Sequence, residues 1–162
     1  MGKTLVLMRH GQAETFAESD LRRKLTPRGR LDAASVGEAL RPAVRPSAVL
    51  TSPAERARET ARIVAGKLGR DPGRLLELPE LYNAGPEEVV ELLHGAFYGG
   101  DAILLTGHNP VLPEVAELLG GSVSSLRPAG ALLLRFDCGS WEEVGRETFL
   151  DMVRFSPQYQ YQ

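Results

Sequence analysis

The sequence predicts an α/β domain built around a largely parallel β-sheet. Short continuous apolar runs alternate along the chain with longer amphipathic segments, which is the order that successive parallel β-α-β units produce. The length of 162 residues fits one domain with an adequate hydrophobic core. We therefore expect a single domain over 1–162.

The composition disfavours several classes of protein. Nineteen Lys and Arg against 21 Asp and Glu give a net charge of −2, whereas nucleic-acid-binding proteins usually carry a basic excess. No apolar stretch approaches the roughly 18 residues that a membrane span requires, and the N-terminal apolar run is too short for a signal peptide. The single cysteine, Cys138, permits no disulfide within the chain. We expect a cytoplasmic protein with no membrane or nucleic-acid partner.

The chain begins with a continuous apolar run over 4–8, which is typical of a strand buried on both faces. Residues 9–25 lack periodicity and are expected to form a loop. Thr26 then provides an N-cap with Pro27 at the first helical position, and this helix should end before Pro42.

A second strand is predicted over 47–51. The tetrapeptide Ser-Pro-Ala-Glu at 52–55 has the composition of a capping box with proline at the first helical position, which predicts a helix from 53 to about 68. Asn109 before Pro110 repeats the order of cap and proline. The remaining elements are expected as a short strand over 75–78, a helix over 87–94, a buried strand over 102–106, a helix from 110 to 119, and strands over 131–136 and 149–155.

Unusual residues stand where three predicted strands end. Arg9 and His10 follow the first strand, the second leads through Ser52 to Arg56, and His108 follows the strand over 102–106. Ligands of open α/β sheets bind at the carboxyl ends of the strands. Two histidines and two arginines therefore converge if these strands are neighbours in one parallel sheet.

Arg56 falls in the first turn of its predicted helix, where the helix dipole disfavours a cation by a few tenths to about 1 kcal/mol. An anion bound at the helix start would compensate, because the backbone N–H groups and the arginine would share it. The alternative is a solvated arginine that pairs with Glu55 or Glu59.

His10 lies between Arg9 and Gly11, a glycine that permits a sharp turn and a close approach of the backbone to a ligand. The adjacent arginine should lower the pKa of His10 and keep the imidazole neutral, and a neutral imidazole is a nucleophile. The alternative is a histidine satisfied by a backbone carbonyl at a strand end. His108 repeats the arrangement beside Gly107.

Other chemistries lack their residues. Zinc is the competing use of two histidines, but no HExxH sequence or nearby cysteine completes a ligand set, and Arg9 would repel a dication. A cysteine phosphatase needs an arginine six positions after its cysteine, where Cys138 is followed by Val144. We expect Cys138 to be a small strand-end residue and His94 to interact with the dipole at a helix C-terminus.

The segment around Arg9-His10-Gly11 resembles the RHG signature of the histidine phosphatase superfamily, which includes phosphoglycerate mutases and acid phosphatases. The resemblance implies a phosphoglycerate mutase-like fold, a three-layer α/β/α sandwich with a mixed, mostly parallel sheet. Three further segments follow in the family's order, namely 51–60 with Arg56 as phosphate-binding arginine, 78–81 with Glu80 as catalytic acid, and 106–110 with His108 as second catalytic histidine.

Within the superfamily the chain is most similar to the compact SixA-type phosphohistidine phosphatases, on segments 19–26, 78–81 and 155–157. This similarity implies Asp20 as an alternative general acid to Glu80 and Arg23 as an extra phosphate ligand. Asp20 could instead pair only with its basic neighbours Arg22, Arg23 and Lys24.

The resemblance implies a mechanism without metal or cofactor. Arg9, Arg56 and His108 would bind the phosphoryl oxygens, with Gly11 beside them, and His10 would attack phosphorus to form a phosphohistidine that water hydrolyses.

The expected substrate is a protein phosphorylated on histidine, because 162 residues leave no room for a large cap over the pocket. A small phosphate ester, as in a phosphomonoesterase or a mutase, is the alternative, and a catalytically inactive phosphate-binding module is the third possibility.

Overall fold

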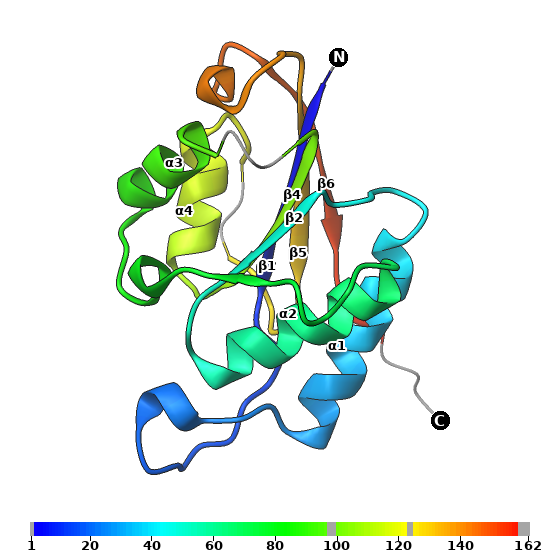
Figure 1. Cartoon of the computed structure of the whole chain (residues 1–162), viewed down its shortest axis with the longest axis vertical. Helices are drawn as coiled ribbons and strands as arrows, with labels where there is room; N and C mark the ends of the chain where they lie inside the picture. Colours follow the sequence, from blue (N-terminus) through cyan, green and yellow to red (C-terminus); the bar gives the residue numbers. More distant parts are fainter. Residues whose placement is uncertain (1, 97–99, 123–124, 159–162) are drawn as a thin grey trace.

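The computed structural model describes residues 2–96, 100–122 and 125–158, and it contains a six-stranded sheet between two layers of helices (Figure 1). The strands lie side by side in the order β3-β2-β4-β1-β5-β6. Their bounds are Lys3–Arg9 for β1, Ala48–Thr51 for β2, Leu76–Glu77 for β3, Ala102–Gly107 for β4, Ala131–Phe136 for β5 and Phe149–Phe155 for β6.

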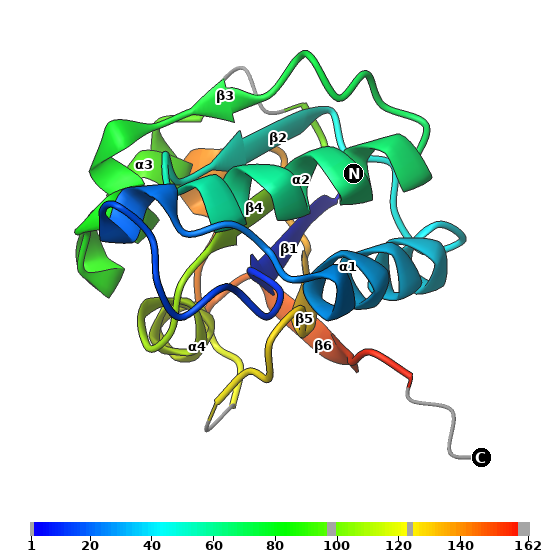
Figure 2. The same cartoon turned by 90° about the horizontal axis from the view of Figure 1, so that it is seen from below.

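The helices cover both faces of the sheet (Figures 1 and 2). One layer contains α1 (Pro27–Leu40) and α2 (Glu55–Lys67), and the other contains α3 (Pro86–His94) and α4 (Val111–Leu118). Short 3₁₀ helices span Asp20–Arg22, Pro79–Tyr82 and Trp141–Glu143. The predicted three-layer α/β/α sandwich is confirmed. Within the described residues, no helix has the length and apolar character needed to cross a membrane.

The centre of the sheet is parallel, as predicted. β4 lies between β1 and β2 and pairs in parallel with both, so that Arg9 stands opposite Gly107 and Thr51 opposite Thr106. The carboxyl ends of three strands therefore meet at one edge. β5 runs antiparallel to β1, and β6 antiparallel to β5, which makes the sheet mixed.

Alternation of side chains along β1 explains its continuous apolar run. Leu5 and Leu7 belong to the core shared with α3 and α4, whereas Val6 and Met8 belong to the core shared with α1 and α2. All four side chains are fully buried. A strand that is covered on both faces needs apolar residues at every position, so the run indicates a central strand.

The helix starts match the predictions in part. Thr26 caps α1, and its hydroxyl accepts a hydrogen bond from the Gly29 N–H at 3.0 Å. α2 begins later than predicted, at Glu55, with Ala54 at the N-cap position. The predicted capping box at Ser52 is therefore wrong.

α4 also begins later than predicted. Its first residue is Val111, and Pro110 occupies the N-cap position after a cis Asn109–Pro110 peptide bond, so Asn109 is not the cap. The segment over 9–25 is not a continuous loop, because the 3₁₀ helix Asp20–Arg22 interrupts it. This helix carries Asp20 to the site described below.

α1 packs directly against the chain that follows His10. A Cβ atom on Gly29 would overlap the carbonyl oxygen of Gln12, and one on Gly11 would lie 2.7 Å from the carbonyl oxygen of Gly29. The absence of side chains at Gly11 and Gly29 therefore allows the backbone contact that fixes the turn after His10.

We expect Gly29→Ala to lower the free energy of unfolding by about 1–3 kcal/mol, since the methyl group must displace backbone. Gly66→Ala in α2 is the matched control, because its Cβ would meet only Pro72 Cγ at 3.8 Å. That helical substitution should stabilise the protein by about 0.5–1 kcal/mol. Urea unfolding measures both effects, and a Gly29→Ala variant as stable as Gly66→Ala would contradict the packing argument.

Candidate active site

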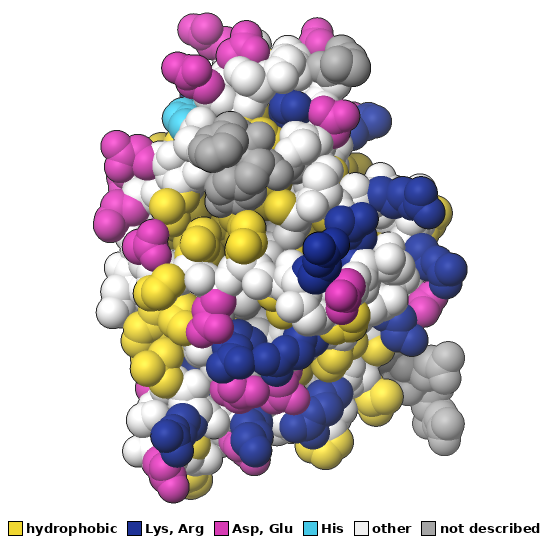
Figure 3. Space-filling model, in the orientation of Figure 1, with side chains coloured by type: hydrophobic (Ala, Val, Ile, Leu, Met, Phe, Trp, Pro, Cys, Tyr) yellow, Lys and Arg dark blue, Asp and Glu magenta, His cyan; other side chains and the backbone are white. Residues whose placement is uncertain are grey.

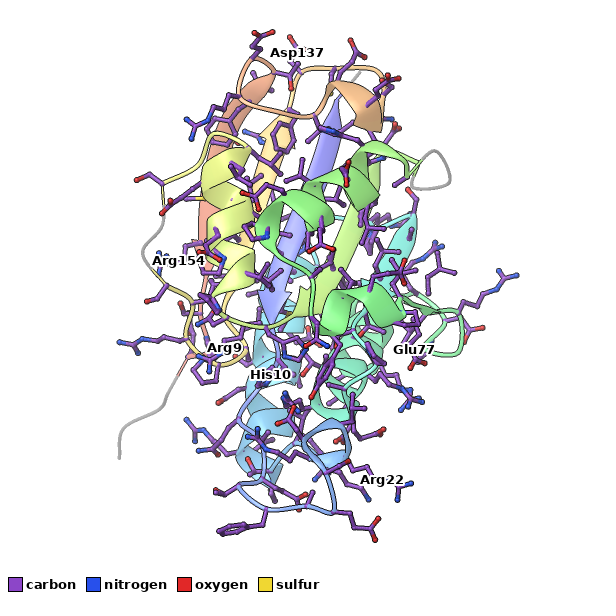
Figure 4. The ribbon with its side chains drawn as sticks, turned by 90° about the vertical axis from the view of Figure 1, so that its left-hand side faces the viewer. Arg9, His10, Arg22, Glu77, Asp137 and Arg154 are labelled. Carbon is purple, nitrogen blue, oxygen red and sulfur yellow. The ribbon has the colours of Figure 1, made fainter. Side chains whose placement is uncertain are left out.

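The edge where β1, β4 and β2 end opens into a pocket of about 370 Å³. Arg9 is the last residue of β1, and His10 follows it at this edge (Figure 4). The pocket brings together most of the site residues predicted from the sequence and adds three others. Its lining residues are Arg9, His10, Asp20, Arg23, Arg56, Tyr82, Asn83, His108 and Asn109.

Backbone hydrogen bonds fix His10. Its N–H donates to the carbonyl of Gly107 at 3.0 Å, and its carbonyl accepts from the N–H of Ala129 at 3.0 Å. The ring nitrogen Nδ1 lies 2.7 Å from the carbonyl oxygen of Gly11. A carbonyl can only accept, so Nδ1 carries the ring proton and Nε2 keeps its lone pair.

The surroundings of His10 keep its ring neutral. Burial lowers its pKa to about 3, and the charges of His108, Arg56 and Arg9 act in the same direction, while the bond to Gly11 opposes them. At neutral pH the imidazole is therefore an uncharged nucleophile. The expected lowering of the pKa of His10 is present, with burial as its first cause rather than Arg9.

His108 lies beside His10, with ring centroids 5.4 Å apart. Its Nε2 is 2.8 Å from the hydroxyl oxygen of Ser52, and this oxygen accepts the N–H of Ala54 at 3.2 Å. Ser52 thus orients His108 instead of capping α2. Burial, reinforced by Arg56, lowers the pKa of His108 to about 4, against the opposing charge of Asp20.

The two arginines present partly unused donor groups. Arg9 Nη1 donates to the carbonyl of Leu126 at 3.0 Å, and burial lowers its pKa. Arg56, with 7% of its side chain exposed, donates to Asp20. The Nε atoms of Arg9 and Arg56 are both buried without a hydrogen-bond partner among the described residues. Donors of this kind suit an oxyanion with several oxygens.

Asp20 is the acidic partner of Arg56, instead of the alternative Glu55 or Glu59. Its Oδ2 accepts Arg56 Nη2 at 3.0 Å and the Tyr82 hydroxyl at 2.6 Å, and its Oδ1 accepts Arg23 Nη1 at 3.0 Å. The bond from Tyr82, followed by those from Arg23 and Arg56, holds the pKa of Asp20 well below its usual range. Asp20 is therefore a carboxylate at neutral pH.

Glu80 is not brought to this pocket. It lies exposed on the 3₁₀ helix Pro79–Tyr82 and lines a separate surface pocket with Glu88 and Glu91. Tyr82, from the same helical turn, enters the site in its place. No signal in the sequence singled out Tyr82, because its contact with Asp20 joins segments 62 positions apart.

Gly11, which was predicted to contact phosphate, lies outside the pocket, and so do His94 and Cys138, which were not expected in the site. The Gly11 N–H donates to the Thr60 hydroxyl at 3.1 Å, and Gly11 does not line the pocket. His94 Nε2 lies 2.7 Å from the carbonyl oxygen of Val144. Cys138 is buried after β5.

Within the described part of the chain, no three His, Cys, Asp or Glu side chains lie close enough together to hold a metal ion.

Comparison with known proteins identifies the family to which the chain belongs. A family model of the histidine phosphatase superfamily, branch 1, matches residues 5–112, which is more than half of the chain. The chain therefore belongs to the histidine phosphatase superfamily, as its RHG segment indicated. A search of curated proteins found no match.

Solved structures extend the likeness over nearly the whole chain. The protein histidine phosphatase SixA complexed with tungstate is 26% identical, with a TM-score of 0.81 over 95% of this chain and 97% of that one. A protein from Nakamurella multipartitia that carries the provisional name phosphohistidine phosphatase SixA is 24% identical, with a TM-score of 0.80 over 97% of each chain.

A more distant neighbour is the mycobacterial glucosyl-3-phosphoglycerate phosphatase Rv2419c. It is 16% identical, with a TM-score of 0.65 over 96% of this chain and 98% of that one. These neighbours confirm the predicted phosphoglycerate mutase-like fold.

We expect nitrogen-detected NMR at pH 5 to show His10 as a neutral ring protonated at Nδ1. Since burial opposes the charged form, the ring should become protonated only as the pH falls toward about 3. The neutral nucleophile exists above this pKa and is lost below it. The urea-unfolded chain, titrating near 6.5, provides the reference. A folded-state midpoint near 6.5, or a ring protonated at Nε2, would contradict the site's electrostatics.

Proposed function

We propose that the protein is a phosphatase that removes the phosphoryl group from phosphohistidine on another protein, through a phosphoenzyme at His10. The observation that carries the proposal is the neutral Nε2 of His10 in a pocket with two arginines and His108. A neutral nucleophile beside fixed cationic donors is what phosphoryl transfer requires of a protein, since catalysis there is mostly positioning and charge stabilisation.

In the first step, the Nε2 lone pair of His10 attacks phosphorus and forms a P–N bond. The bond between phosphorus and the leaving atom breaks, and its electron pair goes to that atom. Arg9, Arg56 and His108 donate hydrogen bonds to the phosphoryl oxygens, with Arg23 as an additional ligand at the rim. The Nδ1–H bond to Gly11 holds the ring of His10 during attack.

In the second step, a water oxygen attacks phosphorus and the P–Nε2 bond breaks. Its electron pair returns to Nε2, while a proton of the water passes to the Asp20 carboxylate and then to solvent. Asp20 is the candidate base because it lines the pocket as an ionised carboxylate. Of the two acidic candidates, we therefore retain Asp20, which lines the pocket, and not Glu80.

The ionised state of Asp20 also bears on the substrate. An alkoxide is a poor leaving group and needs a proton at once, which an ionised carboxylate cannot supply. Imidazole has a pKa near 6.5 and leaves as a neutral ring when its other nitrogen carries a proton, so it needs no acid. The pocket therefore favours phosphohistidine over an alkyl phosphate.

The rim of the pocket is compatible with a protein substrate. Asp20 and Asn83 line the pocket and are exposed, as a short domain without a large cap insertion would leave them. Basic and acidic side chains stand side by side around the loop over 12–25 at the lower end of the molecule (Figure 3). We propose a cytoplasmic location, and the net charge of −2 disfavours a nucleic-acid partner.

A small phosphate ester is the second candidate substrate. The glucosyl-3-phosphoglycerate phosphatase among the structural neighbours has the same fold, and this likeness favours a phosphomonoesterase of that kind. An inactive phosphate-binding module is disfavoured, because such a module has no need of a neutral His10 with an unprotonated Nε2.

We expect kcat/KM for a protein phosphorylated on histidine with phosphoramidate to exceed that for glycerol phosphate by at least tenfold. p-Nitrophenyl phosphate, whose phenolate leaves more readily than an alkoxide, should fall between them. Release of inorganic phosphate measures all three. Faster hydrolysis of glycerol phosphate than of the phosphoprotein would overturn the protein-substrate proposal and favour the small-ester alternative.

His10→Ala should abolish turnover of all three substrates, because no other group in the proposal forms the phosphoenzyme. His94→Ala is the matched control, since this histidine bonds the Val144 carbonyl outside the pocket and should leave turnover unchanged. Undiminished hydrolysis by His10→Ala would show that the mechanism is wrong.

A further inference from the structure

Asp20 accepts a hydrogen bond from Arg56, and the proposed mechanism requires the same donor group to bind the phosphoryl group of the substrate. Arg56 Nη2 donates to the Asp20 carboxylate at 3.0 Å, and Nη1 donates to the Asp20 backbone carbonyl at 2.7 Å. Both the carboxylate and a phosphoryl group are anions, so they compete for the same guanidinium edge. Phosphoryl binding at Arg56 therefore requires the carboxylate to give up Nη2.

The geometry of Arg56 favours this exchange. Its Nε is buried without a hydrogen-bond partner among the described residues, while Nη2 on the same edge holds one carboxylate oxygen. A phosphoryl group can engage Nε and Nη2 together as a bidentate fork, which the Asp20 carboxylate does not do. The backbone bond from Nη1 needs no change, so Arg56 keeps its orientation when the carboxylate moves.

Tyr82 is the uncharged partner that remains to Asp20, whereas its other partner, Arg23, is also assigned to the phosphoryl group. Its hydroxyl donates to Asp20 Oδ2 at 2.6 Å, the same oxygen that Arg56 Nη2 contacts. The ring of Tyr82 lies edge-on to His108, with centroids 6.0 Å apart, so the hydroxyl is held inside the pocket. The side chain of Asp20 is 48% exposed and has room to rotate.

Resting on the proposed function, we propose that Tyr82 is a positioning residue for the hydrolysis step. After a phosphoryl group has taken Arg56 Nη2, the Tyr82 hydroxyl keeps the Asp20 carboxylate in the pocket, where it accepts the proton of the attacking water. The attack by His10 releases no proton to Asp20 and does not depend on this contact. Tyr82 therefore acts on the decay of the phosphoenzyme and not on its formation.

Rapid-quench kinetics with p-nitrophenyl phosphate separate the two steps, since nitrophenolate reports formation of the phosphoenzyme and inorganic phosphate reports its decay. Tyr82→Phe keeps the ring against His108 and removes only the hydroxyl. We expect formation within twofold of the original rate and decay slowed about tenfold, as loss of one hydrogen bond to a charged group allows.

Asp20→Asn should slow decay by about a hundredfold or more, as loss of a general base does, and Tyr82→Phe should add nothing in that background. Asp151→Asn is the matched control, because this carboxylate also pairs with an arginine, Arg135, but outside the pocket. Both rates should be unchanged in the control. Equal slowing of formation and decay in Tyr82→Phe would reveal a merely structural role, and unchanged decay would overturn the proposal.

A binding measurement distinguishes failure of this inference from failure of the proposed function. Calorimetry with inorganic phosphate should show tighter binding to Asp20→Asn than to the original protein, about tenfold, because the competing carboxylate charge is gone. Unchanged affinity would overturn the exchange at Arg56 even if the enzyme turns over normally. Absence of any phosphoenzyme in the original protein would instead overturn the proposed function.

Discussion

The parallel pairing of β4 with β1 on one side and with β2 on the other is the constraint on which the site depends. The pairing extends past the end of β1, where the His10 N–H donates to the Gly107 carbonyl at 3.0 Å. His10 and His108 consequently leave the sheet from adjacent strands. β2 leads on the far side of β4 into α2 and Arg56. A shift of one residue in this register would turn every side chain of the shifted strand to the opposite face.

Desolvation determines which of the side chains at this edge of the sheet are charged. Burial keeps His10 and His108 neutral, so the positive charge of the pocket resides on the arginines. The two arginines need acceptors, which Leu126 supplies to Arg9 and Asp20 supplies to Arg56. Because Asp20 supplies its acceptor from a half-exposed side chain, that contact can be exchanged for a phosphoryl group.

The sequence predicted those parts of the fold and site that depend on neighbours in the chain. A continuous apolar run identifies a doubly covered strand, and parallel strands bring their carboxyl ends together, so Arg9, His10 and His108 could be placed in advance. Thr26 also acts as predicted, because its capping bond to Gly29 is local.

The remainder depends on contacts that local patterns do not encode. Ser52 has the composition of a cap, yet its hydroxyl contacts His108 from a distant strand end. Glu80 and Tyr82 stand two positions apart on one 3₁₀ turn, and only one of them can face the pocket. A turn of four residues is too short to show a hydrophobic pattern from which the inward-facing residue could be predicted. Asp20 reaches Arg56 because a short 3₁₀ helix forms within a segment that has no periodicity.

The position of the phosphoryl group on the trapped enzyme tests the central claim most directly. His10 keeps its proton on Nδ1, bonded to the Gly11 carbonyl, and offers only Nε2 to phosphorus. Mass spectrometry and phosphorus NMR of the enzyme quenched in base during turnover should identify a single acid-labile phosphohistidine, at His10 and linked through Nε2. Phosphorylation through Nδ1, or of any residue other than His10, would contradict the account.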